Sequence, residues 1–556
     1  MTSAWGIDLG TTNSVIARLV DGQPAAVAVD EALAIVPSVV LFEDDGSVVV
    51  GRAAMNLELA RPERVVRSAK RRIGGTEPYR LPGGRSVLPE EVSAEVLRAL
   101  KRGAEASTGE AVRDAVITVP AYFDDAQRRA TLKAGELAGL NVLRLLNEPT
   151  SASLVYQAAG LAKDRPRTVL VYDLGGGTFD VSVLEVFESV REVRATAGNS
   201  HLGGDDFDEI VVRTFVDALR AQGADLQGDA RAAAVLRRLA ESTKIRLSSE
   251  TEVRVREEFV ATGGGAPVHL DLTLTRRQLE ERIEPLLAST IELALRAVKD
   301  AGLAPDAIDA ICLVGGSTRI PRVRALLADA FAAEVHEEVD PDLAVGLGAA
   351  VQAGMLAGAP VDRILVDVAA HTLGVRVLGA LDDGYGEPDT FAPVMRRNTA
   401  LPAERAEEFY TMVDDQPAIE VVVFQGEGAR CSENTRVGAF RFPLLPAPSH
   451  APVCFHFAYD LDGIVRVRVA QVGTDNEKTV AMSLPDASER GPVAPGGGDA
   501  PPGAVERRAQ QLLDAPGFPR ADELRGLLAR FRAASGAERT AVEEELLDFF
   551  LDVEAA

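Results

Sequence analysis

Cysteine and histidine are scarce in this chain. Only three cysteines occur among its 556 residues, Cys312, Cys431 and Cys454. Their number and scatter exclude a disulfide framework and a CxxC metal site. The six histidines are also dispersed, and no two have the spacing of a metal-ligand pair, so we expect packing or surface roles for them.

Long apolar runs are missing as well. No segment approaches the roughly 20 apolar residues that a membrane helix needs. The N-terminal residues enter a predicted strand at once, at residues 5–7, and leave no basic segment followed by an apolar signal core. Together with the few cysteines, this predicts a reducing, cytoplasmic location.

Basic residues are the minority among the charged ones. The chain has 59 Lys and Arg against 84 Asp and Glu, a net charge of −25. A negative field repels nucleic acid and anionic membranes, so we expect neither as a partner. The apolar content of 46% and charged content of 26% are typical of globular protein, and the length predicts roughly four domains.

Two common nucleotide-binding motifs do not occur. The chain contains no GxxxxGK[ST] loop, which argues against a P-loop enzyme. No GxGxxG follows the first predicted strand, which disfavours a dinucleotide fold.

A different glycine-rich pattern is present at residues 169–185, VLVYDLGGGTFDVSVLE. An apolar run stops at Asp173, three glycines follow, and a second alternating run begins, so we expect a hairpin. Its tip would offer backbone N–H groups to a phosphate, and Asp173 could hold a hydrated Mg²⁺. An ordinary glycine hairpin is the alternative, because lone Gly-rich motifs often match by accident.

The same pattern occurs at residues 4–19, AWGIDLGTTNSVIARL. Two copies of strand–DLG–turn–strand predict two similar lobes that face one another. One hairpin would then grip a nucleotide's phosphates from each side, with Asp8 and Asp173 converging on a metal ion.

Residues 62–75 hold a basic cluster of Arg64, Arg67, Lys70, Arg71 and Arg72. A lysine here could neutralise a γ-phosphate, and an exposed helix face is the equally open alternative.

Two further stretches carry candidate chemistry. In LRLLNEPTSAS, residues 143–153, Glu148 ends an apolar run where a carboxylate could orient water. In AICLVGGSTRIP, residues 310–321, a buried strand and paired glycines could receive a flat adenine ring, with a helix starting at Ser317 or Thr318. Residues 340–357 predict a Gly/Ala-rich helix.

Beyond Arg363 the apolar period changes from 3.6 to two, with turn residues about every ten positions, as in a β-sandwich. The alternating segments are residues 419–424, 440–442, 455–457 and 465–469. Residues 484–503 predict a flexible Pro/Gly linker. The last fifty or so residues predict helix, with apolar positions at Leu524, Leu527, Leu528, Phe531, Val542, Leu546 and Phe549.

Several long motifs together resemble the DnaK-type chaperones of the heat-shock-seventy family over about residues 1–485. They are GIDLGTTNS (6–14), AKRRIG (69–74), ITVPAYFDDAQR (117–128), NEPTSAS (147–153), YDLGGGTFD (172–180), HLGGDDFD (201–208), LVGGSTR (313–319) and LGAAVQ (347–352).

This resemblance implies a multidomain α/β plus β protein. It implies an actin-like (ribonuclease H-like) two-lobed ATPase domain at residues 1–358, an interdomain linker at 359–368 and a β-sandwich peptide-binding domain at 369–486. A flexible Pro/Gly linker at 487–503 and a short helical, lid-like segment at 504–556 would follow.

The resemblance also implies site residues. Lys70, Glu148, Asp173 and Thr178 would be catalytic, and Asp8 and Asp173 would hold Mg²⁺ through water. ATP or ADP would be bound by Gly10, Thr11, Thr12, Asn13, Gly175, Gly176, Gly177, Thr178, Gly203, Gly204, Glu241, Lys244, Ser248, Gly315, Gly316 and Arg319.

Two further groups of residues follow from the resemblance. Val375, Leu378, Phe409, Met412, Ile419 and Val421 would line a channel for extended, unfolded clients, although Phe409 and Val421 fit sandwich core equally well. Pro120, Arg128, Arg144, Asn147 and Asp367 would couple nucleotide state to the linker, with Arg144 and Asn147 facing a J-domain co-chaperone.

The sequence departs from the family pattern in four places. Residues 74–91 are shorter than the corresponding DnaK segment, which puts dependence on a GrpE-type exchange factor in doubt. The short C-terminal region is similar to the HscC-like branch. Ala369 and Ala370 stand where a Thr–Pro pair is common, and Arg246 replaces an acidic residue.

The resemblance thus implies an ATP-dependent chaperone that releases and rebinds clients as it hydrolyses ATP, with roles in protein folding and the stress response. The alternative is a specialised chaperone or nucleotide-dependent binding protein with narrow clients and weak hydrolysis. Sugar kinases and filament-forming ATPases share the actin-like fold, but neither carries an appended β-sandwich.

Overall fold

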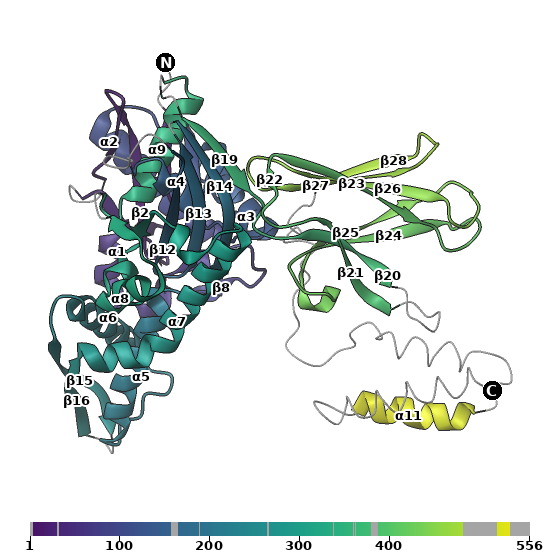
Figure 1. Ribbon diagram of the computed structural model, residues 1–556. Coiled ribbons are helices and arrows are strands. Elements are labelled where there is room, and N and C mark those ends of the chain that lie inside the picture. Colours follow the sequence, from purple (N-terminus) through teal and green to yellow (C-terminus); the bar gives the residue numbers. More distant parts are fainter. Residues whose placement is uncertain are drawn as a thin grey trace. The chain divides into compact units, whose positions relative to one another are not determined.

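A computed structural model describes residues 4–29, 33–156, 165–187, 189–263, 266–336, 339–359, 361, 363–379, 387–481 and 520–533. The chain divides into two compact units, Met1–Pro485 and Asp486–Ala556. The first unit contains two α/β lobes and a pair of β-sheets that follows them in the chain (Figure 1).

The first lobe, lobe I, is built on a mixed sheet in the order β11-β10-β1-β2-β3, with β4 paired to β2. Strand β1 runs antiparallel to β2 and parallel to β10, which is itself parallel to β11. The strands are β1 (Ala4–Asp8), β2 (Asn13–Val20), β3 (Gln23–Ala26), β4 (Ile35–Pro37), β10 (Asp114–Val119) and β11 (Asn141–Asn147).

The second lobe, lobe II, repeats this arrangement in the order β18-β17-β12-β13-β14. Here β12 runs antiparallel to β13 and parallel to β17. The strands are β12 (Arg167–Leu174), β13 (Phe179–Phe187), β14 (Val190–Asn199), β17 (Ala310–Val314) and β18 (Glu334–His336). The repeated sequence motif predicted two similar lobes, and the matching strand order and direction confirm that prediction.

Helices and small sheets complete the two lobes. Lobe I carries α1 (Arg52–Leu57), α2 (Pro89–Thr108), α3 (Asp125–Leu137), the sheet of β5 (Val40–Phe42), β6 (Val48–Val50) and β7 (Val65–Val66), and the hairpin of β8 (Tyr79–Arg80) and β9 (Ser86–Val87). Lobe II carries α5 (Gly204–Arg220), α6 (Ala230–Leu247), α7 (Arg276–Asp300), α8 (Pro321–Ala330) and the hairpin of β15 (Glu252–Gly263) and β16 (Ala266–Thr275). Two more helices, α4 (Glu148–Ser153) and α9 (Ala344–Leu356), pack against each other.

Apolar periodicity explains the core of lobe II. Helix α5 buries Phe207, Val211, Phe215 and Leu219, one residue per turn, as the period of 3.6 in the sequence predicts. Strand β12 is buried at every residue from Val169 to Leu174, because a central strand of such a sheet is covered on both faces.

Two predicted helix starts are wrong, and one alternative that the sequence left open is excluded. Helix α8 begins at Pro321, while Ser317 and Thr318 lie in a 3₁₀ turn, η5 (Gly316–Arg319); the residue before a proline avoids helical backbone angles, so the two segments cannot join. Helix α9 begins at Ala344 rather than at residue 340. The basic cluster is no helix face, because Lys70–Arg72 lie in another 3₁₀ turn, η2 (Ala69–Arg72).

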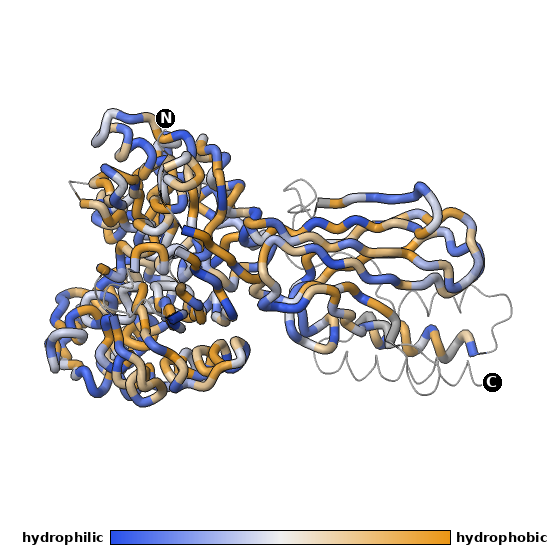
Figure 2. Tube along the Cα trace, turned by 45° about the horizontal axis from the view of Figure 1, so that its top comes forward, coloured by the Kyte–Doolittle hydropathy of each residue, from blue (hydrophilic) through white to orange (hydrophobic). Residues whose placement is uncertain are grey.

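Two four-stranded antiparallel sheets follow the lobes, in the orders β21-β20-β24-β25 and β23-β26-β27-β28. Their strands are β20 (Leu373–Gly379), β21 (Glu387–Met395), β23 (Ala403–Tyr410), β24 (Ala418–Gln425), β25 (Thr435–Pro443), β26 (Pro452–Tyr459), β27 (Val465–Gln471) and β28 (Glu477–Ala481). In both sheets, every second residue of a strand points into one common core. Hydrophobic and hydrophilic positions therefore alternate along the strands (Figure 2). The predicted alternating segments all lie in these strands.

The segment between the lobes and the sandwich is itself a strand, β19 (Ile364–Val368). It extends the sheet of lobe II by pairing in parallel with β14, through residues such as Arg191 and Leu365. Its last two residues pair antiparallel with the short strand β22 (Ala400–Leu401). Residues 364–368 of the predicted linker therefore belong to one continuous sheet that runs from lobe II to β22.

The C-terminal unit is described only over residues 520–533, where α11 (Ala521–Ala533) forms. Leu524, Leu528 and Phe531 are buried in it, as the apolar spacing predicts. The predicted linker at 484–503 and the apolar positions Val542, Leu546 and Phe549 lie outside the described residues. Within the described part of the chain, no helix is both long and apolar enough to cross a membrane.

Helix α9 approaches the lobe I sheet and α4 closely because glycine stands at the contacts. A Cβ on Gly348 would lie 1.8 Å from the carbonyl oxygen of Ser151, and a Cβ on Gly6 would lie 2.0 Å from the backbone of Ala350. The Ser151 hydroxyl also donates to the Val345 carbonyl at 2.7 Å. The crossing of α4 and α9 is therefore fixed at backbone distance.

We expect Gly348→Ala to lower the free energy of unfolding of the N-terminal unit by about 2 kcal/mol, because the added methyl group overpacks this contact. Thermal and urea unfolding measure the change. Gly526→Ala in α11 is the matched control, since a Cβ there meets no atom within 4 Å and alanine favours helix by up to about 1 kcal/mol. Equal stability of Gly348→Ala and the wild type would contradict the expectation.

Candidate functional site

Two glycine-rich turns meet across the cleft between the lobes. The β1–β2 turn of lobe I presents Thr11 and Thr12, and the β12–β13 turn of lobe II presents Gly176 and Gly177. A Cβ on Gly176 would lie 1.8 Å from the Thr12 Oγ1, and one on Gly177 would lie 2.5 Å from the Thr11 Cγ2. Only glycine permits this approach, which brings the backbone N–H groups of both turns to one place.

A third loop closes on the same turn from lobe II. The Ser317 hydroxyl donates to the Gly175 carbonyl at 2.9 Å, and the Gly315 N–H donates to the Pro341 carbonyl at 3.1 Å. Gly315 has a φ of 82°, and a Cβ there would lie 2.4 Å from the Leu174 carbonyl oxygen. Glycine at this position therefore satisfies both the left-handed backbone and the close packing.

These loops enclose a cavity of about 330 Å³. Most of the predicted site residues line it: Asp8, Gly10, Thr11, Thr12, Asn13, Lys70, Glu148, Asp173, Gly175, Gly176, Thr178, Glu241, Lys244, Ser248, Gly315, Gly316 and Arg319. The predicted residues Gly177, Gly203 and Gly204 are not among its lining residues; Gly203 and Gly204 support it from behind, where the Gly204 N–H donates to the Gly175 carbonyl at 3.0 Å.

The deep end of the cavity combines one buried cation with several carboxylates. Lys70 is 5% exposed, and its ammonium group donates to Glu148 Oε1. Asp8 and Asp173 lie close enough to Glu148 to feel its charge. Burial, reinforced by the Glu148 charge, raises the pKa of Asp8 to about 7 and raises the pKa of Asp173 well above its usual range.

This surplus of negative charge fits a bound cation. Two buried carboxylates with raised pKa values ionise readily only when a positive charge is supplied nearby. No three His, Cys, Asp or Glu side chains in the described part of the chain are grouped to ligate one metal ion directly. Asp8 and Asp173 line this end of the cavity together with Glu148, and carboxylate oxygens are the ligands that hard divalent ions prefer.

One polar atom at the other side of the cavity points to a further ligand. Thr12 Oγ1 is buried and has no hydrogen-bond partner among the described residues. A buried polar atom without a partner carries a cost, which an incoming phosphate oxygen would relieve. The neighbouring turn is otherwise held in place, because the Ser38 hydroxyl donates to the Gly10 carbonyl at 2.8 Å.

The outer part of the cavity is lined by residues of α6 and of the turn η5. The Lys244 ammonium donates to Asp208 at 2.9 Å and to the Gly204 carbonyl at 3.1 Å. Burial raises the pKa of Asp208 to about 6 despite this partner. Arg319 is held by Asp340 and Asp342 at 2.7 and 2.9 Å, so its planar group is oriented at the mouth.

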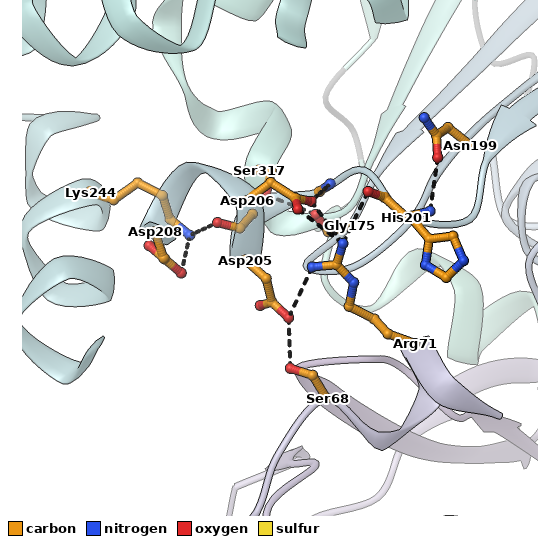
Figure 3. A network of polar contacts seen from close by, with 12 residues as sticks. Ser68, Arg71, Gly175, Asn199, His201, Asp205, Asp206, Asp208, Lys244 and Ser317 are labelled. Carbon is orange, nitrogen blue, oxygen red and sulfur yellow. Dashed lines mark hydrogen bonds and ion pairs between the residues drawn. The ribbon is translucent and has the colours of Figure 1, made fainter. Parts of the chain in front are cut away.

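Direct polar contacts join the lobes above the cavity (Figure 3). Arg71 of lobe I donates to Asp206 at 3.0 Å and to the His201 carbonyl at 3.0 Å, and the Ser68 hydroxyl donates to Asp205 at 2.6 Å. The basic cluster of the sequence therefore divides into the buried Lys70, the two arginines Arg67 and Arg71 that contact lobe II, and Arg64 and Arg72, which pair within lobe I.

A second set of charges joins the lobes beside the first. Arg67 of lobe I contacts Glu58 at 2.8 Å and Glu241 of α6 at 3.0 Å. Arg237 of α6 contacts Glu58 at 3.5 Å. Glu241, predicted as a nucleotide ligand, therefore also serves in closing the cleft.

The predicted coupling residues lie behind the site in a chain of hydrogen bonds. Arg128 donates to Asn147 at 2.8 Å, and Asn147 donates to Asp367 of β19 at 2.9 Å. Pro120 ends the neighbouring strand β10, next to the Ala121 carbonyl that also accepts from Arg128. Arg144 lies outside this chain of bonds, and its Nε has no hydrogen-bond partner among the described residues.

The predicted channel residues of the sandwich divide by burial. Val375 and Val421 are 2% exposed and belong to the common core, while Phe409 and Ile419 pack partly buried against it. Met412 is 64% exposed at the end of the sandwich. The side chain of Leu378, the sixth predicted residue, lies outside the described part.

Sequence reasoning missed three polar residues of the site. Asp180 accepts from the Tyr122 N–H at 2.9 Å, and burial, reinforced by Glu148, raises its pKa to about 7. The sequence could have indicated Asp180, because this residue ends the motif YDLGGGTFD. In the structure it pairs with Asp173 in the β12–β13 register. Ser317 could also have been predicted, because it lies in the motif LVGGSTR. Asp342 lies in none of the recognised motifs.

A comparison with protein families agrees with this geometry. The family model described as Hsp70 protein matches residues 4–491, which covers both lobes, β19 and the sandwich.

The contacts across the cleft yield a test. We expect Arg71→Met to accelerate dissociation of ADP about fivefold, because losing a partly buried ion pair between the lobes costs about 1 kcal/mol of closure. Stopped-flow chase of a fluorescent ADP analogue measures this rate. Arg254→Met, which breaks an exposed pair within lobe II, should leave it unchanged; identical rates for Arg71→Met and the wild type would contradict a closing role.

Proposed function

Because the chain belongs to the Hsp70 family, we propose that it is an ATP-dependent molecular chaperone of the DnaK type. It hydrolyses ATP in the cleft and couples the nucleotide state to binding and release of extended hydrophobic segments of unfolded proteins. The observation that carries this proposal is the cavity between two facing glycine turns, with the ion pair of Lys70 and Glu148 at its deep end.

The chemistry is transfer of a phosphoryl group to water, in which catalysis is mainly positioning and neutralisation of charge. Backbone N–H groups of the two facing turns bind the phosphates. The Lys70 ammonium neutralises charge on the γ-phosphate, and Glu148, which already accepts from Lys70, orients the attacking water. Thr178 lines the cavity beside the turn and positions the γ-phosphate.

Asp8 and Asp173 hold magnesium through water in this proposal. The ion supplies positive charge that offsets the phosphates and the surrounding carboxylates. The Thr118 hydroxyl donates to Asp8 at 2.9 Å, which keeps this carboxylate oriented. Glu241, Lys244, Ser248 and Arg319 receive the adenosine at the outer end.

The nucleotide state is coupled to the sandwich through the backbone next to Glu148 and through the side chain of Asn147. This residue directly precedes Glu148 in the chain and donates to Asp367 of β19. Strand β19 in turn extends the lobe II sheet and pairs with β22. A shift of Glu148 with the γ-phosphate therefore acts on the strand that connects the sheet with the sandwich.

Clients bind to the sandwich as extended segments, through backbone hydrogen bonds and apolar contacts. The exposed Met412 and the partly buried Phe409 and Ile419 support contact with leucine-like side chains. A J-domain co-chaperone engages the surface around Arg144 and Asn147 and stimulates hydrolysis. The short segment at residues 74–91 supports the HscC-like branch, with little dependence on a GrpE-type exchange factor.

We expect single-turnover ATP hydrolysis by the wild type to accelerate when an unfolded peptide and a J-domain are added. Lys70→Ala should lower the hydrolysis rate by a hundredfold or more, because one group that neutralises transition-state charge is lost. Rapid-quench measurements with radiolabelled ATP give these rates.

Lys299→Ala, at an exposed position of α7, is the control for loss of a lysine. ATP binding by calorimetry separates loss of chemistry from loss of affinity. A Lys70→Ala variant that hydrolyses ATP at the wild-type rate would refute the assigned mechanism. Slow hydrolysis that responds to neither peptide nor J-domain would favour the specialised binding protein instead.

We expect Met412→Ser to weaken binding of a fluorescent leucine-rich peptide about tenfold without a change in thermal stability, because its exposed side chain contributes apolar contact only when peptide is bound. Val421→Ser should instead destabilise the sandwich, since it places a hydroxyl in the core. Fluorescence anisotropy and calorimetric melting separate the two effects. Unchanged affinity in Met412→Ser would remove this residue from the channel.

A further inference from the structure

Two buried serines lie behind the β1–β2 turn of lobe I. Ser14 is the second residue of β2 and is fully buried, and Ser38, which directly follows β4, is 7% exposed. Strand β4 brings them together, because Ser14 pairs with Val36 in the β2–β4 register. Their hydroxyl oxygens lie 2.9 Å apart.

The hydrogen bonds of these serines form a closed ring that begins and ends at Gly10. The Ser38 hydroxyl lies 2.8 Å from the Gly10 carbonyl oxygen, which can only accept, so the single proton of Ser38 points there. The Ser14 hydroxyl therefore donates to Ser38 Oγ, and Ser14 Oγ accepts from the Gly10 N–H at 3.2 Å. Each donor is used once, and each bond polarises the next.

The ring holds both the N–H and the carbonyl group of Gly10, where the turn begins. A further bond holds the other side of the turn, from the Ser38 N–H to the Thr12 carbonyl at 2.8 Å. The backbone between them is tight, because a Cβ on Gly10 would lie 1.9 Å from the Asn13 carbonyl oxygen. Ser38 therefore fixes the turn at two points.

The polar groups of the turn that the ring leaves out are those that a phosphate needs. Within the described part of the chain, the N–H groups of Thr11 and Thr12 donate to no carbonyl. Thr12 Oγ1 has no partner there either. Such donors bind an anion most tightly when the backbone that carries them is already in the bound conformation.

The serines themselves lie outside the nucleotide cavity. The described residues that line it include Thr11 and Thr12 but neither serine. Ser38 lines a second cavity, of about 520 Å³, which shares Thr11 and Thr12 with the first. The serines can therefore act on a bound nucleotide only through the turn.

We propose that Ser14 and Ser38 are positioning residues for the phosphates, because their hydrogen-bonded ring with Gly10 holds the β1–β2 turn in its phosphate-binding conformation before a nucleotide enters. This inference rests on the proposed function and deepens it. The ring acts on the phosphates and not on the adenosine, which residues of α6 and η5 in lobe II receive.

The test uses the full chain with magnesium and measures the Kd of ADP and of adenosine, which lacks phosphates, by calorimetry. We expect Ser38→Ala to weaken ADP binding about tenfold, the effect of losing one buried hydrogen bond. Adenosine binding should stay within about twofold of the wild type, since the outer end of the cavity is unchanged. Ser14→Ala opens the ring at its other member and should give the same difference between the two ligands.

A double variant tests whether the ring acts as a unit. Ser14→Ala combined with Ser38→Ala should weaken ADP binding by about thirtyfold at most, well below the hundredfold product of the single effects, because opening the ring once already releases the turn. Thr131→Val is the matched control. It removes a buried hydroxyl of lobe I that donates to the Gln127 carbonyl at 2.9 Å within α3, and it should bind both ligands like the wild type.

Circular dichroism establishes that each variant is folded. If Ser38→Ala does not fold, Ser38→Cys carries the same test, because a thiol keeps the volume and donates only weakly. Equal losses of ADP and adenosine affinity in a folded variant, an unchanged affinity for ADP, or a double variant at the full product would each overturn the proposal.

The wild-type affinities keep this inference separate from the proposed function. If the wild type binds ADP no more tightly than adenosine, the proposed phosphate site itself fails. If the wild type binds ADP far more tightly and hydrolyses ATP, but the serine variants bind ADP as it does, only the role of the ring fails.

Discussion

The contact of two glycine turns across the cleft is the constraint on which the rest of the molecule depends. Gly176 and Gly177 allow the lobe II hairpin to touch Thr12 and Thr11 at distances that no side chain would permit. This approach places two sets of backbone donors around one cavity. The repeated strand order of the lobes brings the turns to matching sheet edges, and the ion pairs above the cavity keep them there.

Whether the two lobes stay closed around the cavity depends on the charges that the cavity holds. Lys70 is the buried cation beside Asp8, Glu148 and Asp173, and burial raises the pKa values of Asp8 and Asp173. Like charges held out of water repel strongly, so the site lowers its free energy by binding cations or protons. A site of this kind responds to its ligands, because its electrostatic free energy differs between the occupied and empty forms.

The same cavity is connected to the sandwich by short covalent and hydrogen-bonded steps. Glu148 follows Asn147, which donates to Asp367 in β19, and Asp180 accepts from Tyr122, which contacts His371. Both connections end in the segment between lobe II and the sandwich. Strand β19 lies between β14 and β22 and pairs with each of them over only a few residues.

Much of the local structure, though not every helix start, could be predicted from the sequence alone. Alternating and 3.6-residue apolar periods predicted the lobe strands, helix α5 and the sandwich, because burial of one face depends only on spacing. The motifs around Asp8, Asp173 and Gly315 predicted glycine turns, since backbone conformation there depends on the residue itself. The repetition of one motif predicted the two lobes.

Contacts between distant segments were decided only by the tertiary structure. Arg71 and Lys70 are neighbours in a basic cluster, yet one joins the lobes and the other is buried beside Glu148. Asp342 and His371 carry no local signal, because their partners lie tens to hundreds of residues away. Pairing of charges and burial of a ring depend on which surfaces meet, and that is a property of the assembled lobes and sandwich rather than of any stretch of sequence.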